Sequence, residues 1–305
     1  MKPIVILALL ATSIFSHYAP PPPAANLDPV PDFNQICAEA GTRSNACFVS
    51  TLDALDYARR AEGLGPLYLP RNWRSLTGAE QVFVITNLER IARSEQPIPG
   101  LTRSLNQVAY EAAVHHTDPV LMGSFPHGPA VSIWAESPGP LASDYDWMYF
   151  DGFNGPLRTP NLACQTPKAS GCWGHRNNIL AEWSTHLMAD LPEPWYLVAG
   201  AAEVPVPATP HLSPISETME SDAMIVTAVW QPPHYVYTWR QAVKEGAGSR
   251  TRGWNPAATD RVAIVPLEAL ARIRTHAVIG LSAAVAGLMV WFGRRPRRRR
   301  RPFAS

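Results

Sequence analysis

Apolar residues recur at helical spacing along the first half of the chain. In three segments they form a stripe on one side, which predicts amphipathic helices over Ser50–Gly63, Thr77–Arg93 and Thr102–His115. The middle segment opens with Thr77-Gly-Ala-Glu80, the sequence of a capping box. A short aromatic helix is expected over Ser143–Phe150. The first half of the chain is therefore predicted to be mainly helical.

Short runs of β-branched and apolar residues predict strands. One run spans Ala130–Ala135, and two longer runs, Trp195–Val204 and Ala223–Trp230, follow in the second half. Because the strands do not alternate regularly with helices, this order predicts an α+β fold rather than a series of βαβ units. Beyond Trp239 the chain is rich in Lys, Gly, Ser and Arg, which predicts a stalk over residues 241–275.

Both ends of the chain carry apolar runs that are typical of membrane targeting. Residues 1–25 combine an early cation, an apolar run and a proline-rich spacer, which predicts a signal peptide. Residues 276–293 are predicted to be a transmembrane helix, since Ala277–Phe292 is uncharged and seven arginines follow in the tail 294–305. A buried helix is the alternative at either end. The expected localisation is the cell membrane, single-pass, with an extracellular N-terminal domain and a cytoplasmic basic tail.

The distribution of charge argues against one class of partner. The whole chain has a net charge of +1, but residues 3–260 carry a net charge of −9, and seven arginines in the tail supply most of the compensating positive charge. A protein that binds nucleic acid needs a basic face to contact the phosphates. We therefore expect no nucleic-acid partner for the globular part.

The four cysteines form two local pairs, Cys37/Cys47 and Cys164/Cys172. An even number of cysteines outside the cytosol favours disulfide bonds. Three connectivities are possible, and pairing of sequence neighbours is preferred because each pair closes a short loop. Structural zinc is the rival interpretation, but neither pair has the C-x₂₋₄-C spacing of zinc ligands.

One decapeptide, Gly171–Leu180 (GCWGHRNNIL), concentrates the candidate chemistry. Gly174 permits a tight turn ahead of a helix start, so the imidazole of His175 is expected at a loop–helix junction, where polar side chains commonly face a cleft. A Cys164/Cys172 disulfide would staple the loop that leads into this histidine. His175 is therefore the first candidate for ligand or metal binding.

Residues 87–90 read NLER, residues 116–119 read HTDP, and Trp147-Met148 precedes Gly174–Leu180. In this order they resemble the Asn-x-x-Arg, His-Thr-Ser-Pro and Trp-Met … Gly-His-Arg-x-Asn-Ile-Leu motifs of the CAP superfamily, and most of all its bacterial secreted members. An insertion that carries Cys164 and Cys172 separates the two halves of the last motif. The resemblance identifies residues 76–240 as a CAP/SCP-like domain and leaves residues 26–75 as an N-terminal helical extension.

The resemblance implies a three-layer α-β-α sandwich with a cleft lined by two histidines and two acidic residues, which in some members binds a divalent metal such as zinc. His116 and His175 match the histidines and are the candidate metal ligands. Ser132 and Phe150 stand in the places of the two acids, so Glu136 and the neighbouring Asp151 are the available substitutes. The candidate ligand-binding residues are His116, His175, Glu136 and Ser132.

No familiar hydrolase motif accompanies the two histidines, since HExxH, GxSxG and a Gly-rich phosphate loop are absent from the sequence. The favoured function is an extracellular binding or interaction module whose cleft holds a small apolar, peptide or envelope ligand. The alternative is a histidine- or metal-dependent hydrolase of peptides or cell-envelope polymers, with its catalytic residues unknown. In a third interpretation the two histidines hold helix ends together, and Asn87, Arg90 and Trp147 are structural residues beside the core.

Overall fold

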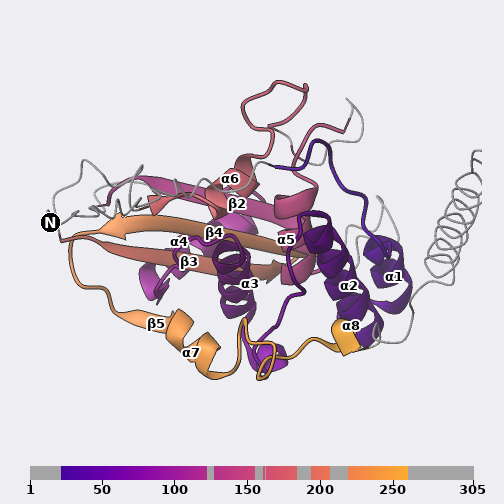
Figure 1. Cartoon of the computed structure of the whole chain (residues 1–305). Coiled ribbons are helices and arrows are strands. Elements are labelled where there is room, and N and C mark those ends of the chain that lie inside the picture. The colour runs from indigo at the N-terminus through magenta and orange to yellow at the C-terminus, as the bar shows by residue number, and fades with distance from the viewer. Residues whose placement is uncertain are drawn as a thin grey trace, which may run out of the picture. The chain divides into compact units, whose positions relative to one another are not determined.

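The structure, a computed structural model, describes residues 22–121, 127–154, 161, 163–183, 194–206 and 219–259 (Figure 1). Within this part of the chain no helix is long and apolar enough to cross a membrane. The predicted transmembrane helix 276–293, the basic tail 294–305 and most of the predicted signal peptide lie outside the described residues. The membrane localisation therefore stays a prediction.

The described chain combines helices with a single mixed sheet. The longer helices are α1 Phe33–Ala40, α2 Asn45–Ala61, α3 Gly78–Ala92, α4 Arg103–Val114 and α5 Pro140–Tyr149. The shorter ones are η1 Trp73–Ser75, α6 Gly174–Ile179, α7 Trp239–Lys244 and α8 Pro256–Thr259. The strands are β1 Gly100–Thr102, β2 Ala130–Ser137, β3 Tyr196–Pro205, β4 Glu220–Val229 and β5 Tyr235–Thr238. Their order is β2-β4-β3-β1-β5, with β1 and β3 parallel and the other neighbours antiparallel, which confirms the predicted α+β class.

The two faces of the central strand β3 pack against different helices. Leu197 and Ala199 belong to the core cluster that contains residues of α3, whereas Val198 packs with Leu105 of α4. Gly200 lies under α4, and a Cβ added there would come within 2.0 Å of the carbonyl carbon of Leu105. The missing side chain thus allows α4 to lie directly on the sheet. Helices cover both faces of the sheet, as Figure 1 shows.

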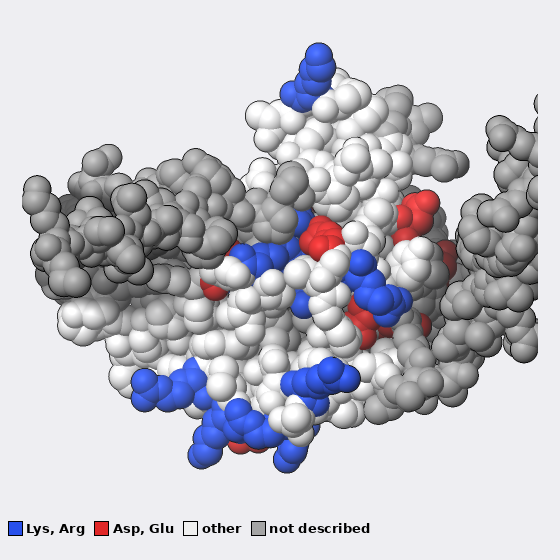
Figure 2. Space-filling view, in the orientation of Figure 1, with Lys and Arg blue, Asp and Glu red and all other residues white. Residues whose placement is uncertain are grey.

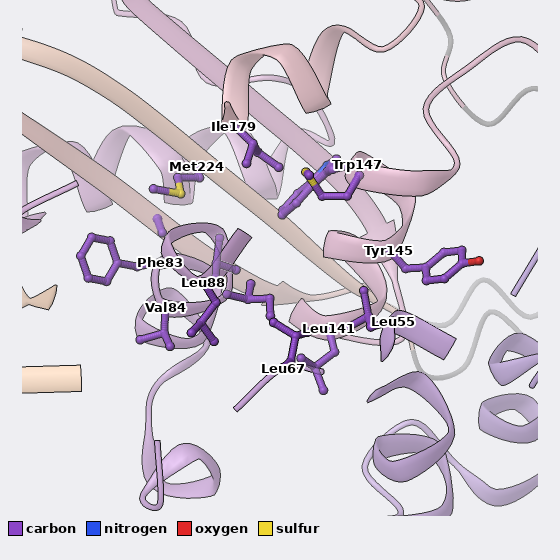
Figure 3. Packing of buried hydrophobic residues seen from close by; sticks show 14 of the residues in the cluster. Leu55, Leu67, Phe83, Val84, Leu88, Leu141, Tyr145, Trp147, Ile179 and Met224 are labelled. Atoms are coloured by element: carbon purple, nitrogen blue, oxygen red, sulfur yellow. The ribbon is translucent and has the colours of Figure 1, made fainter. Parts of the chain in front are cut away.

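The main hydrophobic core lies on the α3 side of the sheet. Figure 3 shows Phe83 of α3 packed in the same cluster as Leu55 of α2 and Trp147 of α5. Burying one such side chain stabilises a fold by about 1.5–3 kcal/mol. The segment 26–75, interpreted from sequence as an N-terminal extension, therefore shares one core with residues 76–240.

The best-predicted helices are those with strong capping signals. In α3 the Thr77 hydroxyl accepts from the Glu80 amide at 3.3 Å, and the Glu80 carboxylate accepts from the Thr77 amide at 2.8 Å, which confirms the capping box. The Thr102 hydroxyl accepts from the backbone amide of Leu105 at the start of α4. Both helices begin and end within two residues of their predicted limits.

The motif residues Asn87, Arg90 and Trp147 have structural contacts, as the third interpretation predicts. The Asn87 amide donates to the Ile98 carbonyl at 3.2 Å and accepts from its amide at 2.7 Å, which fixes the turn after α3. The Arg90 guanidinium donates to the Ile179 carbonyl at 2.6 Å and to a second carbonyl just beyond α6. The indole of Trp147 donates to a carbonyl of β2 at 3.0 Å.

Elements without a local signal were missed or misplaced by sequence reasoning. α2 starts at Asn45 with Ser44 as its N-cap, not at Ser50, whose hydroxyl is buried and donates to the Cys47 carbonyl. The short strands β1 and β5 were not expected, because three or four residues are too few to show a period of two. α1 was also missed; Asp32 caps it.

Both disulfides have the predicted connectivity. Cys37–Cys47 joins α1 to α2, and Cys164–Cys172 closes the loop that precedes α6. The predicted stalk, residues 241–275, is packed on the domain as far as Ala258. The last four residues of α7 lie in that segment. The Gly248 amide donates to the Tyr68 carbonyl at 2.7 Å, and the Asn255 amide donates to the buried Asp56 carboxylate at 2.9 Å. The chain therefore packs onto the N-terminal helices before it leaves the described part.

Candidate functional site

A buried carboxylate, Asp151, positions the candidate histidine His175. Asp151 follows α5, and its Oδ2 accepts from the backbone amide of His175 at 2.8 Å in the first turn of α6. The Asp151 carbonyl accepts from the amide of Trp173. Trp173 makes the sharp turn before α6 and has a left-handed backbone conformation (φ 62°). The sequence placed this turn at Gly174, one residue later. The sharp turn and the carboxylate together fix where α6 starts.

The ring of His175 lies between two carboxylates. Its Nδ1 is 2.7 Å from Oδ1 of Asp151, and its Nε2 is 3.6 Å from Oδ1 of Asp118. Burial lowers the pKa of His175, but the contacts with Asp118 and Asp151 outweigh burial and raise the pKa to about 9. The ring is therefore an imidazolium at neutral pH, with one N–H directed at each carboxylate.

His116 occupies a strained position at the end of α4. The His116 amide donates to the Ala113 carbonyl and the Thr117 amide to the Ala112 carbonyl, which together form a Schellman motif. His116 has φ 53°, in the position that glycine commonly takes. Its Nδ1 lies 3.4 Å from Oε2 of Glu136, and both side chains are more than one third exposed.

The two histidines share one cleft of about 380 Å³. The lining residues that carry polar chemistry are His116, Thr117, Asp118, Glu136, Asp146, Asp151, Asn161 and His175. Aromatic side chains, including Trp134 and Phe150, line the remainder, and the His116 ring meets Trp134 edge to face with a centroid distance of 6.3 Å. The structure thus brings together three of the four candidate residues.

Ser132 is the candidate that the structure does not bring into the cleft. It lies on β2, where its carbonyl accepts from the side-chain amide of Asn178 on α6 at 2.8 Å. Residues alternate between the faces of a strand, and Glu136 is on the same strand four residues later. Ser132 is half-buried beside Asn178 and Ile179 of α6, whereas Glu136 lines the cleft near the end of β2. Sequence matching therefore placed the serine correctly on the strand but not at the site.

Two acidic residues of the cleft were not among the candidates. Asp118 stands where the resembling family has serine, and it lies opposite His175. Asp146 is on α5, one residue before Trp147, and burial together with the charge of Asp151 raises its pKa to about 7 although His175 opposes that shift. Asp146 belongs to no recognisable sequence motif. It reaches the site because α5 packs beside α6.

The side chains do not suit a zinc ion. No group of three or more His, Cys, Asp or Glu side chains in the described ranges is arranged to hold a metal ion. Zinc needs a neutral imidazole with a free nitrogen. In His175 both ring nitrogens already face carboxylates, and its pKa is about 9. We therefore assign no step at this site to a metal.

The fold and the site together define an α+β domain with a histidine–carboxylate cleft at the sheet edge formed by β2. Comparison of the chain with protein-family models, with curated proteins and with solved structures found no match.

Proposed function

We propose that the chain is an exported, membrane-tethered protein with a CAP/SCP-like domain that binds an extracellular ligand in the cleft between His116 and His175. One observation carries the proposal. His116 and His175 come from motifs that are distant in sequence, and they line the same cleft, as the resemblance requires. The helices on both faces of the sheet and the two disulfides are consistent with it.

The cleft chemistry suits a ligand that is both cationic and partly apolar. Its described lining includes the carboxylates of Asp118, Glu136, Asp146 and Asp151 but no Lys or Arg. The one fixed positive charge, on His175, is already shared between two of these carboxylates. Opposite charges give an interface its specificity and register. We therefore propose a lysine- or arginine-bearing peptide, or an amine-bearing envelope component, as the ligand.

A peptide-binding measurement tests this proposal. The full chain in detergent is titrated with a fluorescent peptide of alternating Lys and Leu, and with a matched peptide of alternating Glu and Leu. We expect Glu136→Gln to weaken binding of the Lys peptide by about threefold, the scale of one partly exposed charge pair. Ser132→Ala, on the same strand but outside the cleft, is the control. Equal losses in both variants, or no preference between the peptides, would contradict the proposal.

Asp146 favours hydrolysis as a second candidate function. A carboxyl group whose pKa is about 7 can give and take a proton near neutral pH, as general acid–base catalysis requires. On this alternative, Asp146→Asn abolishes the release of soluble fragments from isolated cell envelopes, and Ser132→Ala leaves that release unchanged.

The export and the membrane tether are tested by a separate experiment. Protease added to intact cells should digest the described domain and spare the tail 294–305.

A further inference from the structure

Five exposed cationic side chains gather around α7 and the loop that follows it. They are Arg71, Arg240, Lys244, Arg250 and Arg252, and we refer to them as the α7 basic surface. The Arg71 amide donates to the Glu245 carbonyl at 2.9 Å, which places residue 71 beside the end of α7. Arg240 and Lys244 are one helical turn apart on α7, and the Gly253 amide folds the loop back on the Ser249 carbonyl.

This surface contrasts with the charge of the rest of the globular part. It holds five of the fifteen Lys and Arg residues between positions 3 and 260, a stretch with a net charge of −9. In the described ranges none of the five takes part in an ion pair. Figure 2 shows Lys and Arg gathered along the edge of the molecule where α7 lies, with little acidic surface between them.

Aromatic and apolar residues neighbour these cations along the chain. Trp239 starts α7 and is half-buried, as is Trp254, which pairs with Leu69 through two backbone hydrogen bonds. Val236, on the edge strand β5, is 41% exposed. Trp side chains beside Lys and Arg are the combination that proteins use where they meet lipid headgroups.

The chain leaves the described unit at α8, which begins four residues after Arg252 and lies beside α2 in Figure 1. α8, which ends at Thr259, follows Trp254 directly. Seventeen residues, 260–276, separate it from the apolar run that begins at Ala277. Fully extended, they span at most about 60 Å. If Ala277–Phe292 enters a membrane, that membrane lies within about 60 Å of the end of α8. The α7 basic surface immediately precedes α8 in the chain.

We propose that the α7 basic surface lies against the anionic lipid headgroups of the membrane that holds residues 277–292. This proposal rests on the tether in the proposed function. Each Lys or Arg near an anionic leaflet strengthens membrane association by about fivefold, so five together hold the domain against the lipid. The acidic cleft is formed by β2, α5 and α6, at the opposite edge of the sheet order from β5.

Lysine labelling of the full chain tests the proposal. Apart from Lys2 near the N-terminus, the chain contains two lysines, Lys168 and Lys244, and both are exposed. The full chain is reconstituted in vesicles of phosphatidylcholine alone, or with about one third phosphatidylglycerol, and treated with a membrane-impermeant amine reagent. We expect labelling of Lys244 relative to Lys168 to fall by about fivefold in the anionic vesicles. Lys168, on the disulfide-closed loop, controls for orientation, because both lysines lie in the same domain.

Salt and substitutions show whether charge is the cause. In about 1 M salt, where the screening length shrinks from about 10 Å to about 3 Å, the protection of Lys244 should disappear. In the double variant Arg250→Glu/Arg252→Glu, Lys244 should be labelled to the same extent in neutral and in anionic vesicles. Arg60→Glu, an exposed charge reversal on α2, should retain the protection. Equal labelling of Lys244 in both vesicles with the unmodified chain would overturn the proposal.

Two further outcomes separate this surface from the tether and from other occupants. A chain that fails to float with neutral vesicles refutes the tether, and protection of Lys244 in anionic vesicles alone would then still support the basic surface. A short DNA duplex, offered in solution at about 0.15 M salt, tests for a general polyanion site. If the duplex protects Lys244 as well as the anionic vesicles do, the assignment to lipid is refuted.

Discussion

Asp151→Asn is the substitution that tests the site most directly. Asp151 is 2% exposed, and its carboxylate accepts from the backbone amide and the ring of His175. Asparagine has the same shape and keeps one oxygen as an acceptor, so the start of α6 can be retained. The substitution removes the negative charge that lies 2.7 Å from the imidazole. It also replaces one acceptor oxygen by an NH2 group that faces an N–H donor.

The size of the effect follows from the linkage between protonation and folding. The pKa of His175 rises from the ordinary value of 6.5 to about 9 in the folded protein. Because the folded state holds this proton more tightly, the stabilisation is complete below pH 6.5 and is lost as the pH rises through about 9. At pH 7 it amounts to about 2–3 kcal/mol, and at pH 10 it has gone. Asp118 and Asp151 both raise this pKa. Because Asp151 is buried and lies closer to the ring, we expect it to supply the larger share.

Two measurements check the reasoning. Imidazole NMR should show His175 titrating near pH 9 in the unmodified protein and at least about 1 unit lower in the Asp151→Asn variant. Urea unfolding should show a larger loss of stability at pH 7 than at pH 10. The charge-dependent part, at most about 2–3 kcal/mol, is present only at pH 7, whereas the lost acceptor costs about 1–3 kcal/mol at both values. The matched control is Asp118→Asn. Asp118 is about half exposed and 3.6 Å from the ring, so its loss should shift the titration less.

The reasoning would be refuted by a stability gap of equal size at pH 7 and pH 10. Such a result would show that Asp151 stabilises α6 through neutral hydrogen bonds and that the imidazolium contributes nothing. A His175 that titrates near 6.5 in the unmodified protein would refute it as well.

Three further predictions concern the surroundings of the site. Glu89→Gln removes the carboxylate that the buried Arg59 and Arg93 share, and only Arg93 keeps a second carboxylate partner, Glu62, so we expect urea unfolding to show a loss of about 3 kcal/mol. The pKa of Glu89 falls from 4.5 to about 2 in the folded protein. The stabilisation by its charge is therefore complete above pH 4.5 and is lost as the pH falls through about 2. His116→Gly relieves the positive φ and should raise stability by about 1 kcal/mol while weakening the peptide binding described above. Replacing Cys164 and Cys172 together by Ser should cost about 2.5 kcal/mol, and an unchanged urea midpoint would contradict it.

Sequence reasoning succeeded where one short segment contains the whole signal. A capping box needs only four residues, and α3 starts where Thr77 and Glu80 predict. It failed where the partner is distant. β1 is three residues long and exists because β3 and β5 flank it, so no local pattern could reveal it. The first part of the predicted stalk, through Ala258, packs on the domain for the same reason, since Trp254 pairs with the distant Leu69.

The candidate site shows the same division. Motifs identified His116 and His175, and the structure places them in one cleft. The acidic residues could not be found by matching positions, because a carboxylate can reach a histidine from several places in a fold. Asp118 does so from the turn beyond α4, and Asp151 from the end of α5. Ser132 holds the expected strand position, yet its strand neighbour Glu136 supplies the carboxylate.

The contacts of Asp151 also explain how the chain accommodates the insertion before α6. The Asn161 amide donates to both the carbonyl and the carboxylate of Asp151, and to the carbonyl of Gly171. The two ends of the inserted loop are thus tied to the residue that fixes His175, and the Cys164–Cys172 disulfide closes the loop between them. Changes within the loop need not move α6. His175 is consequently held in place by charge, whereas the more exposed His116 and Glu136 are presented at the cleft by the end of α4 and by β2.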